Sequence, residues 1–161
     1  MIGFREMARK KQQLSRAECE ELLIREKRGV LSVLGDGGYP YGIPLNHWYC
    51  EEDGRLYFHS GKSGHKLDAL RKHGKASFCV LDEGRPEQEG GWALRFRSVI
   101  VFGRLEEVED HDRAIEITRA LCHKFTSDEE YIEKEIENAG ARTMVVCLTP
   151  EHMTGKTVLE S

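Results

Sequence analysis

The pattern of hydrophobic and polar residues predicts one helix and then several strands in the first half of the chain. Ser15-Arg16-Ala17-Glu18 has the spacing of a capping box, and three apolar residues follow it at 22–24. This pattern predicts a helix from Ser15 to Arg28 that ends at Gly29. Runs of β-branched and aromatic residues between glycine-rich turns then predict strands. These strands are expected over Val30–Leu34, Tyr39–Tyr49 and Arg55–His59.

Alternation within the second of these strands places Tyr39, Tyr41, Ile43 and Leu45 on one face. A further strand is expected over Lys75–Leu81, after Gly74. The polar, glycine-rich segment Asp82–Gly91 predicts a flexible loop, which precedes an unusually long strand over Trp92–Val108.

Gly103 interrupts a bulky, β-branched run in that long strand and predicts a bulge or bend. Asp110 is expected to cap one helix, and Ser127 or Asp128 a second. A last strand is expected over Thr143–Thr149, ended by Pro150. The simplest architecture is mainly β with peripheral helices (α+β), a closed or nearly closed antiparallel barrel. We expect one domain over residues 1–161, with 1–14 as an N-terminal arm.

Composition narrows the possible partners. The formal charge is -4 and the pI about 6.0, which argues against nucleic acid as the main partner despite the basic residues Arg5, Arg9, Lys10 and Lys11. No apolar run approaches the roughly 20 residues that span a bilayer, and the N-terminus lacks the apolar core of a signal peptide. The sequence therefore predicts a cytoplasmic protein with no membrane partner.

The cysteines and histidines give little support for a disulfide framework or a metal site. The five cysteines occur singly, without a CxxC pair, and the seven histidines are dispersed. We therefore expect no bound metal. No Ser-His-Asp order, paired-carboxylate motif or P-loop points to another chemistry.

The segment from Phe58 to Leu70 carries the strongest chemical signal. It has the pattern of a strand that passes through a small-residue loop into the first turn of a helix. Ser63 is expected to cap this helix, and Gly61 and Gly64 permit close approach of a ligand to the backbone. His65 and Lys66 add donors on the first turn. The segment predicts a phosphate site; the alternative is an ordinary surface turn with solvated side chains.

Several ordered motifs resemble the pyridoxamine 5'-phosphate oxidase-like flavin-binding superfamily, in particular its nitroimidazole-resistance branch. The resemblance covers nearly the whole chain. It rests on Phe4-Arg5-Glu6-Met7, Gly-Tyr-Pro-Tyr-Gly-Ile-Pro-Leu-Asn at 38–46, Tyr-Phe-His-Ser-Gly-Lys-Ser-Gly-His-Lys at 57–66, Phe-Arg-Ser-Val-Ile-Val-Phe-Gly at 96–103 and Leu-Thr-Pro-Glu-His-Met-Thr-Gly-Lys at 148–156.

This resemblance implies a split β-barrel, a tight homodimer and one FMN in each of two clefts at the dimer interface. His65 and Lys66, with Ser60 and Gly61, would hold the FMN phosphate. The other implied cofactor-binding residues are Tyr41, Gly42, Ile43, Pro44, Leu45 and Asn46 along the isoalloxazine ring, His59, and Arg97 and Ser98 near the phosphate or ribityl chain. For the aromatic and proline positions, the alternative is plain barrel core. We also expect the dimer to cover an apolar patch around Val99 and Val101.

The end of the chain separates it from true pyridoxamine phosphate oxidases, which carry an arginine-containing C-terminal signature. Here Gly155-Lys156-Thr157-Val158-Leu159-Glu160-Ser161 stands instead, so oxidation of vitamin B6 is not expected. The resemblance favours an oxidoreductase that passes electrons from reduced flavin to a small, flat acceptor such as a nitroaromatic. Two alternatives stay open: a protein that binds flavin without turnover, and a haem-binding split barrel with His47 or His59 as axial ligand.

Overall fold

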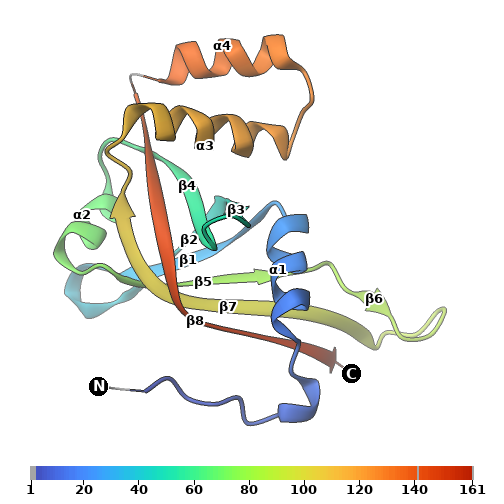
Figure 1. Cartoon of the computed structure of the whole chain (residues 1–161). Coiled ribbons are helices and arrows are strands. Elements are labelled where there is room, and N and C mark those ends of the chain that lie inside the picture. Colours follow the sequence, from blue (N-terminus) through green and yellow to red (C-terminus); the bar gives the residue numbers. More distant parts are fainter. Residues whose placement is uncertain (1–2, 141, 161) are drawn as a thin grey trace.

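A curled antiparallel sheet dominates the chain (Figure 1). The computed structural model describes residues 3–140 and 142–160. The strand order is β2-β1-β5-β7-β8-β4-β3, with β6 paired to β7. The strands are β1 (Arg28–Leu34), β2 (Pro40–Asn46), β3 (Trp48–Cys50), β4 (Arg55–Gly61), β5 (Lys75–Leu81), β6 (Arg85–Pro86), β7 (Leu94–Glu107) and β8 (Thr143–Glu160). The expected fold, a mainly β split barrel with peripheral helices, is confirmed.

Four helices surround this sheet: α1 (Arg16–Arg25), α2 (His65–Lys72), α3 (His111–His123) and α4 (Glu129–Ala139). In Figure 1, α3 and α4 stack above the sheet, and α1 and α2 flank its opposite sides. The capping box is present, since Ser15 Oγ accepts from the Glu18 N–H at 3.2 Å and the Glu18 carboxylate accepts from the Ser15 N–H at 2.7 Å. Asp110 and Asp128 cap α3 and α4. No helix in the described part of the chain is long and apolar enough to cross a membrane.

The inward residues of the strands form the main core together with one face of α1 and α2. Alternation along β1 buries Leu31 and Val33, while Val30, Ser32 and Leu34 lie on the outer face. Phe58 and Phe78 meet edge to face at the centre, 4.9 Å between ring centroids. A smaller apolar cluster lies under α3 and includes Ile117 and Leu121.

The first helix is shorter than expected, and the strand after it begins earlier. α1 ends at Arg25, and Glu26 is already extended. Arg28 and Gly29 belong to β1, because they pair with Asn46 and Leu45 across the β1–β2 hairpin. Pairing between strands thus overrides local helix propensity at this boundary.

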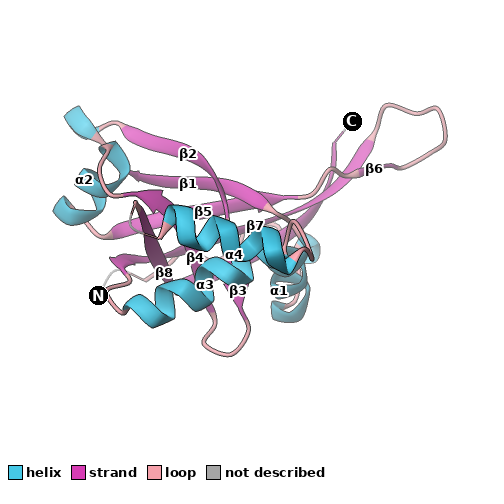
Figure 2. Cartoon of the chain, turned by 90° about the horizontal axis from the view of Figure 1, so that it is seen from above, coloured by secondary structure: helices cyan, strands magenta, loops and turns pink. Residues whose placement is uncertain are grey.

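The expected strand Tyr39–Tyr49 divides into β2 and β3 at His47, whose buried ring lies in the core. Tyr41, Ile43 and Leu45 pack against the core as expected, but Tyr39 precedes the strand and is 76% exposed. The segment Asp82–Gly91 contains β6 and forms, with the start of β7, a hairpin that projects from the body (Figure 2).

The last strand does not end at Pro150 but continues to Glu160. The reason is a register shift between β7 and β8: Phe102 pairs with His152 and Gly103 pairs with Pro150, so that Glu151 of β8 is left without a partner in the ladder. A proline, which lacks an N–H, is tolerated where a bulge interrupts the ladder. Gly103 is required there, because a Cβ on it would lie 2.2 Å from the Thr149 carbonyl oxygen.

The apolar outer face of β7 also differs from expectation. Val99 and Val101 are fully buried in the core, so they form no surface patch. Their neighbours Ile100 and Phe102 are the outward residues, 38% and 41% exposed. Burial alternates without interruption from Val99 to Leu105, so packing of the sheet, and not sequence alternation by itself, selects which of the two alternating sets faces the core.

Candidate functional site

The candidate site lies between β2 and β4. These strands stand near opposite ends of the sheet order and are not hydrogen-bonded to each other. They enclose a cavity of about 360 Å³, within the range of roughly 300–1,000 Å³ for small-molecule sites. Four predicted cofactor-binding residues line it: Pro44, Leu45, Asn46 and His59.

His59 brings an unsatisfied polar atom to this cavity. Its Nε2 is buried and has no hydrogen-bond partner among the described residues. Burial lowers the pKa of His59, so the neutral imidazole is favoured. Buried polar atoms are nearly always paired, so a ligand with a hydrogen-bonding edge fits this position.

Directly after His59, at the C-terminal end of β4, the chain passes through Ser60 and Gly61 toward α2. Gly64, not Ser63, is the N-cap of this helix, and no side chain caps it. Gly64 has φ 129° and ψ 169°, a conformation that residues with a Cβ rarely adopt. Ser63 precedes this N-cap by one residue and does not cap the helix. The positive end of α2 therefore has no side-chain oxygen on it, which agrees with an anion site.

Lys66, on the first turn of α2, is partly buried and makes no ion pair or hydrogen bond with any residue that the structure describes. Burial lowers the pKa of Lys66. Among the predicted phosphate ligands, the Lys66 ammonium group is therefore the strongest candidate to bind an anion.

His65 is more constrained than the sequence indicated. Its ring stacks on Tyr41 of β2, with centroids 4.1 Å apart. Its Nε2 accepts a hydrogen bond from the Asp36 N–H at 3.2 Å, so the proton lies on Nδ1. His65 thus fastens α2 to the β1–β2 hairpin and keeps one nitrogen that can donate to a ligand.

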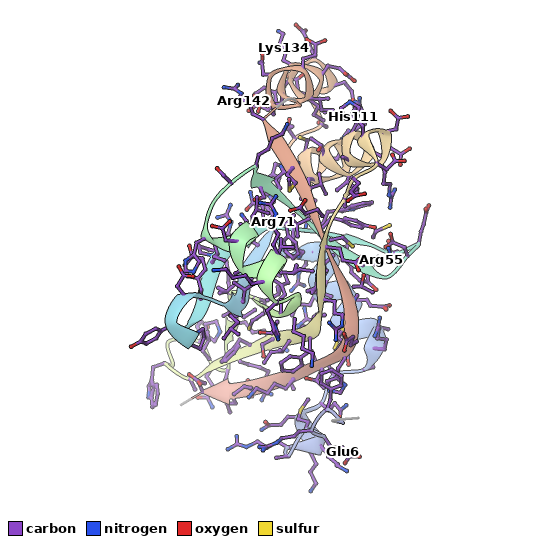
Figure 3. All side chains as sticks on the ribbon, turned by 90° about the vertical axis from the view of Figure 1, so that its left-hand side faces the viewer. Glu6, Arg55, Arg71, His111, Lys134 and Arg142 are labelled. Atoms are coloured by element: carbon purple, nitrogen blue, oxygen red, sulfur yellow. The ribbon has the colours of Figure 1, made fainter. Side chains whose placement is uncertain are left out.

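A further contact anchors the far end of α2. Arg71 donates to the Glu107 carboxylate at 2.7 Å, which joins the helix to the end of β7. Figure 3 shows Arg71 on the face of the molecule that carries α2. The helix that presents Lys66 is therefore held at both ends.

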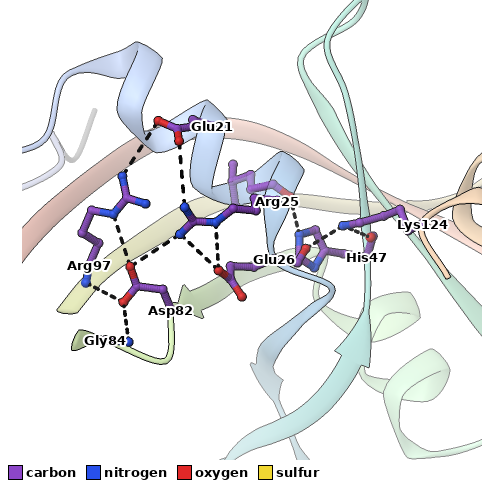
Figure 4. Close-up of polar contacts among 9 residues, drawn as sticks. Glu21, Arg25, Glu26, His47, Asp82, Gly84, Arg97 and Lys124 are labelled. Carbon is purple, nitrogen blue, oxygen red and sulfur yellow. Dashed lines mark hydrogen bonds and ion pairs between the residues drawn. The ribbon is translucent and has the colours of Figure 1, made fainter. Parts of the chain in front are cut away.

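Arg97 and Ser98 are not brought to this helix within one chain. Ser98 pairs with Leu81 at the far end of β5, and α2 precedes the near end of that strand. The seven residues of β5 span about 20 Å. Arg97 instead donates to Asp82 at 3.2 Å and lies 3.9 Å from Glu21 of α1 (Figure 4).

Two cavity residues lie outside the predicted set. Arg28 donates to the Asn46 side chain at 3.1 Å, and Leu121 reaches the cavity from α3. The register of the β1–β2 hairpin would have identified Arg28, because Arg28 and Asn46 are cross-strand partners. No sequence signal places Leu121, because α3 meets β4 only through tertiary packing.

The two histidines considered as haem ligands occupy different environments. His47 is fully buried, lies edge-on to Phe78, and its Nε2 donates to the Leu23 carbonyl at 2.7 Å. Burial lowers the pKa of His47 to about 3. Only His59 lines the cavity. No group of three or more histidine, cysteine, aspartate or glutamate side chains suited to a metal occurs in residues 3–140 and 142–160.

Comparisons with known proteins show the family and the fold of this chain. The family model described as pyridoxamine 5'-phosphate oxidase matches residues 15–157. The chain belongs to this family. A search of curated protein sequences finds no match for this family member.

Solved structures match it over most of its length. A candidate 5-nitroimidazole antibiotic resistance protein of Bacteroides thetaiotaomicron is 21% identical, with a TM-score of 0.77 over 90% of this chain and 86% of the other. An FAD-binding protein of Mesorhizobium loti is 25% identical, with a TM-score of 0.64 over 91% and 97%. An FAD- and haem-binding protein of Mycobacterium smegmatis is 21% identical, with a TM-score of 0.72 over 93% and 74%. These likenesses establish the split-barrel fold of this oxidase-family chain.

Proposed function

We propose that this chain is a flavin-binding protein that holds FMN in the slot between β2 and β4. Lys66 carries the proposal: it is a partly buried ammonium group without a counterion among the described residues, on a helix N-terminus that no side chain caps. His59 supports it from the other end of the slot, where its Nε2 lacks a partner in the same part of the chain. The family membership and the solved FAD-binding structures support a flavin as the ligand.

The two ends of the slot have the chemistry of the two ends of FMN. Pro44, Leu45 and His59 offer a mainly apolar wall and one polar atom to a flat ring. Tyr41 lies toward the other end of β2, stacked on His65 at the start of α2. Ser60 and Gly61 lie between His59 and that helix on β4. The phosphate of a ligand laid along β2 therefore meets Lys66 and the N–H groups of the first helical turn.

We further propose that the loaded protein is an oxidoreductase that passes electrons to a small acceptor such as a nitroaromatic. Bound flavin would supply the redox chemistry. The residues of the chain would orient the ring, exclude water on the core side and, through His59, hold a hydrogen bond at the ring edge. The likeness to the candidate nitroimidazole resistance protein supports the acceptor class.

A homodimer is part of this proposal, because the outer sheet face carries apolar residues that the described chain covers only in part, through Phe4, whose ring stacks on Phe102 with centroids 5.7 Å apart. Val30, Cys79 and Ile100 are successive cross-strand neighbours on that face, and Phe102 lies in the next row. A second copy packed there would complete the cleft and place the partner's Arg97 within reach of the cofactor. We expect an interface above about 2,000 Å² in total and a dimer in sedimentation at micromolar concentration.

A spectrum of the purified protein tests the cofactor directly. Flavin absorption bands, followed by mass spectrometry of the released molecule, would identify FMN or another flavin. A sharp Soret band would instead indicate a bound haem, with His59 as the candidate axial ligand. Loading the protein with FMN and finding no binding would contradict the proposal.

Stopped-flow reoxidation tests the activity. Reduced, FMN-loaded protein is mixed with nitroaromatic or quinone acceptors, with free reduced FMN as the control. We expect faster reoxidation by at least one acceptor and negligible oxidation of pyridoxamine phosphate. No acceleration over free FMN would favour a binding protein without turnover, and efficient pyridoxamine phosphate oxidation would refute the acceptor assignment.

A further inference from the structure

Lys124, at the C-terminal end of α3, joins three parts of the chain that are distant in sequence. Its Nζ donates to the Glu26 carbonyl at 2.6 Å and to the His47 carbonyl at 2.7 Å (Figure 4). Glu26 is the C-cap of α1, and His47 is the residue between β2 and β3. The ammonium group therefore satisfies a carbonyl at the negative end of α1 as well as one where β2 leaves the sheet.

The surrounding contacts make this junction rigid. The His47 N–H donates to the Lys27 carbonyl at 3.2 Å, and the His47 ring is fixed in the core by Leu23 and Phe78. The Lys27 ammonium lies over the Phe125 ring, 5.3 Å from its centroid. The end of α3 thus clamps the open end of the β1–β2 hairpin.

The clamp matters because hydrogen bonds do not set the distance between the two walls of the slot. β2 and β4 are not paired in the sheet, yet Pro44–Asn46 and His59 line the same cavity. α3 packs against β3, β4 and β8 and contributes Leu121 to that cavity. Lys124 is one helical turn beyond Leu121 and holds the residue that follows Asn46.

We propose that Lys124 is a positioning residue for the ligand slot, which fixes the end of β2 relative to β4 by binding the His47 and Glu26 carbonyls. This inference rests on the proposed flavin-binding function. Partial burial of the Lys124 ammonium group costs free energy, and burial lowers the pKa of Lys124 to about 8. This cost supports a specific role for Lys124 at this position.

Amide hydrogen exchange of the flavin-free protein tests the clamp without relying on flavin. Lys124→Met keeps most of the apolar stem and removes the donor, whereas Lys124→Arg keeps a cationic donor. Lys134→Met, an exposed lysine of α4 paired only with Glu130 in the described chain, is the matched control. We expect faster exchange at the amides of residues 45–47 in Lys124→Met alone, with exchange in β5 and β7 unchanged. A uniform rise over the whole sheet, or no change at residues 45–47, would overturn the proposal.

FMN titration then tests whether the clamp serves the slot. Lys124→Met should weaken FMN binding by about 5- to 150-fold, the usual range of coupling between two sites, and Lys124→Arg should recover most of the affinity. Unchanged affinity in Lys124→Met, despite faster exchange at residues 45–47, would refute the positioning role. If the parent protein itself binds no flavin, the proposed function fails, while the exchange experiment still reports on the clamp.

Discussion

Replacing Lys66 by methionine tests the phosphate site most directly. The substitution keeps most of the apolar stem, with a thioether sulfur in place of one methylene, and removes the ammonium group. Because this group has no ion-pair partner among the described residues, its loss breaks no visible contact of the ligand-free protein. The fold should therefore be retained, and the effect should appear in ligand binding.

The expected magnitude follows from the charge of the ligand. A hydrogen bond between charged groups contributes about 1.5–3 kcal/mol, which corresponds to roughly a 10- to 100-fold weaker affinity for FMN. Riboflavin has the same ring and no phosphate, so Lys66→Met should leave riboflavin binding unchanged. Burial lowers the pKa of Lys66 in the free protein, and a bound phosphate would raise it. The contribution of Lys66 is thus complete at low pH and is lost as the pH rises through the pKa of the complex.

Fluorescence titration of the apoprotein with FMN and with riboflavin measures both affinities. Lys72→Met is the matched control on the same helix, since Lys72 is 75% exposed and lies 3.7 Å from Asp36. It should change neither affinity by more than about twofold, as expected for an exposed pair. Equal losses for FMN and riboflavin in Lys66→Met, or no loss for either, would refute the phosphate assignment.

Four further predictions concern stability and assembly. Gly103→Ala should destabilise the fold by about 1–3 kcal/mol or more in urea unfolding, because the new Cβ meets the Thr149 backbone at 2.2 Å. Ser15→Ala should cost about 1 kcal/mol in the same assay through loss of the capping box. His47, whose pKa is about 3 in the folded protein against an ordinary value of 6.5, takes up a proton on unfolding below pH 6.5. Stability should therefore fall by about 2 kcal/mol between pH 7.5 and pH 5, and a urea series in which His47→Gln shows the same fall would contradict this cause. Phe102→Glu should convert the proposed dimer to monomer in sedimentation; an unchanged dimer would place the interface elsewhere.

Local sequence rules determined the elements whose signals lie within a few residues. Ser15 and Asp110 were found as caps from side-chain chemistry at a fixed spacing, and Asp128 was one of two expected candidates, with Ser127. The cap expected at Ser63 was wrong. Gly103, a glycine inside a β-branched run, was expected to mark a bulge or bend, and the register shift between β7 and β8 does lie between Phe102 and Gly103. The run from Phe58 to Leu70 likewise showed a strand, a glycine-containing loop and a helix, since each step has its own local signature.

Only the tertiary structure decided what depends on pairing between distant segments. The register of the hairpin ended α1 early and placed Arg28 beside Asn46. The bulge at Gly103 let β8 pass Pro150. The same principle applies to the candidate site. The sequence identified Lys66 and His59 as candidate binding residues from their residue types. Packing decides that His59 and Pro44 line the same cavity and that Lys66 has no partner among the described residues. Alternation and capping act over a few bonds, whereas a slot between two unpaired strands exists only once the sheet has curled and α3 has closed over its end.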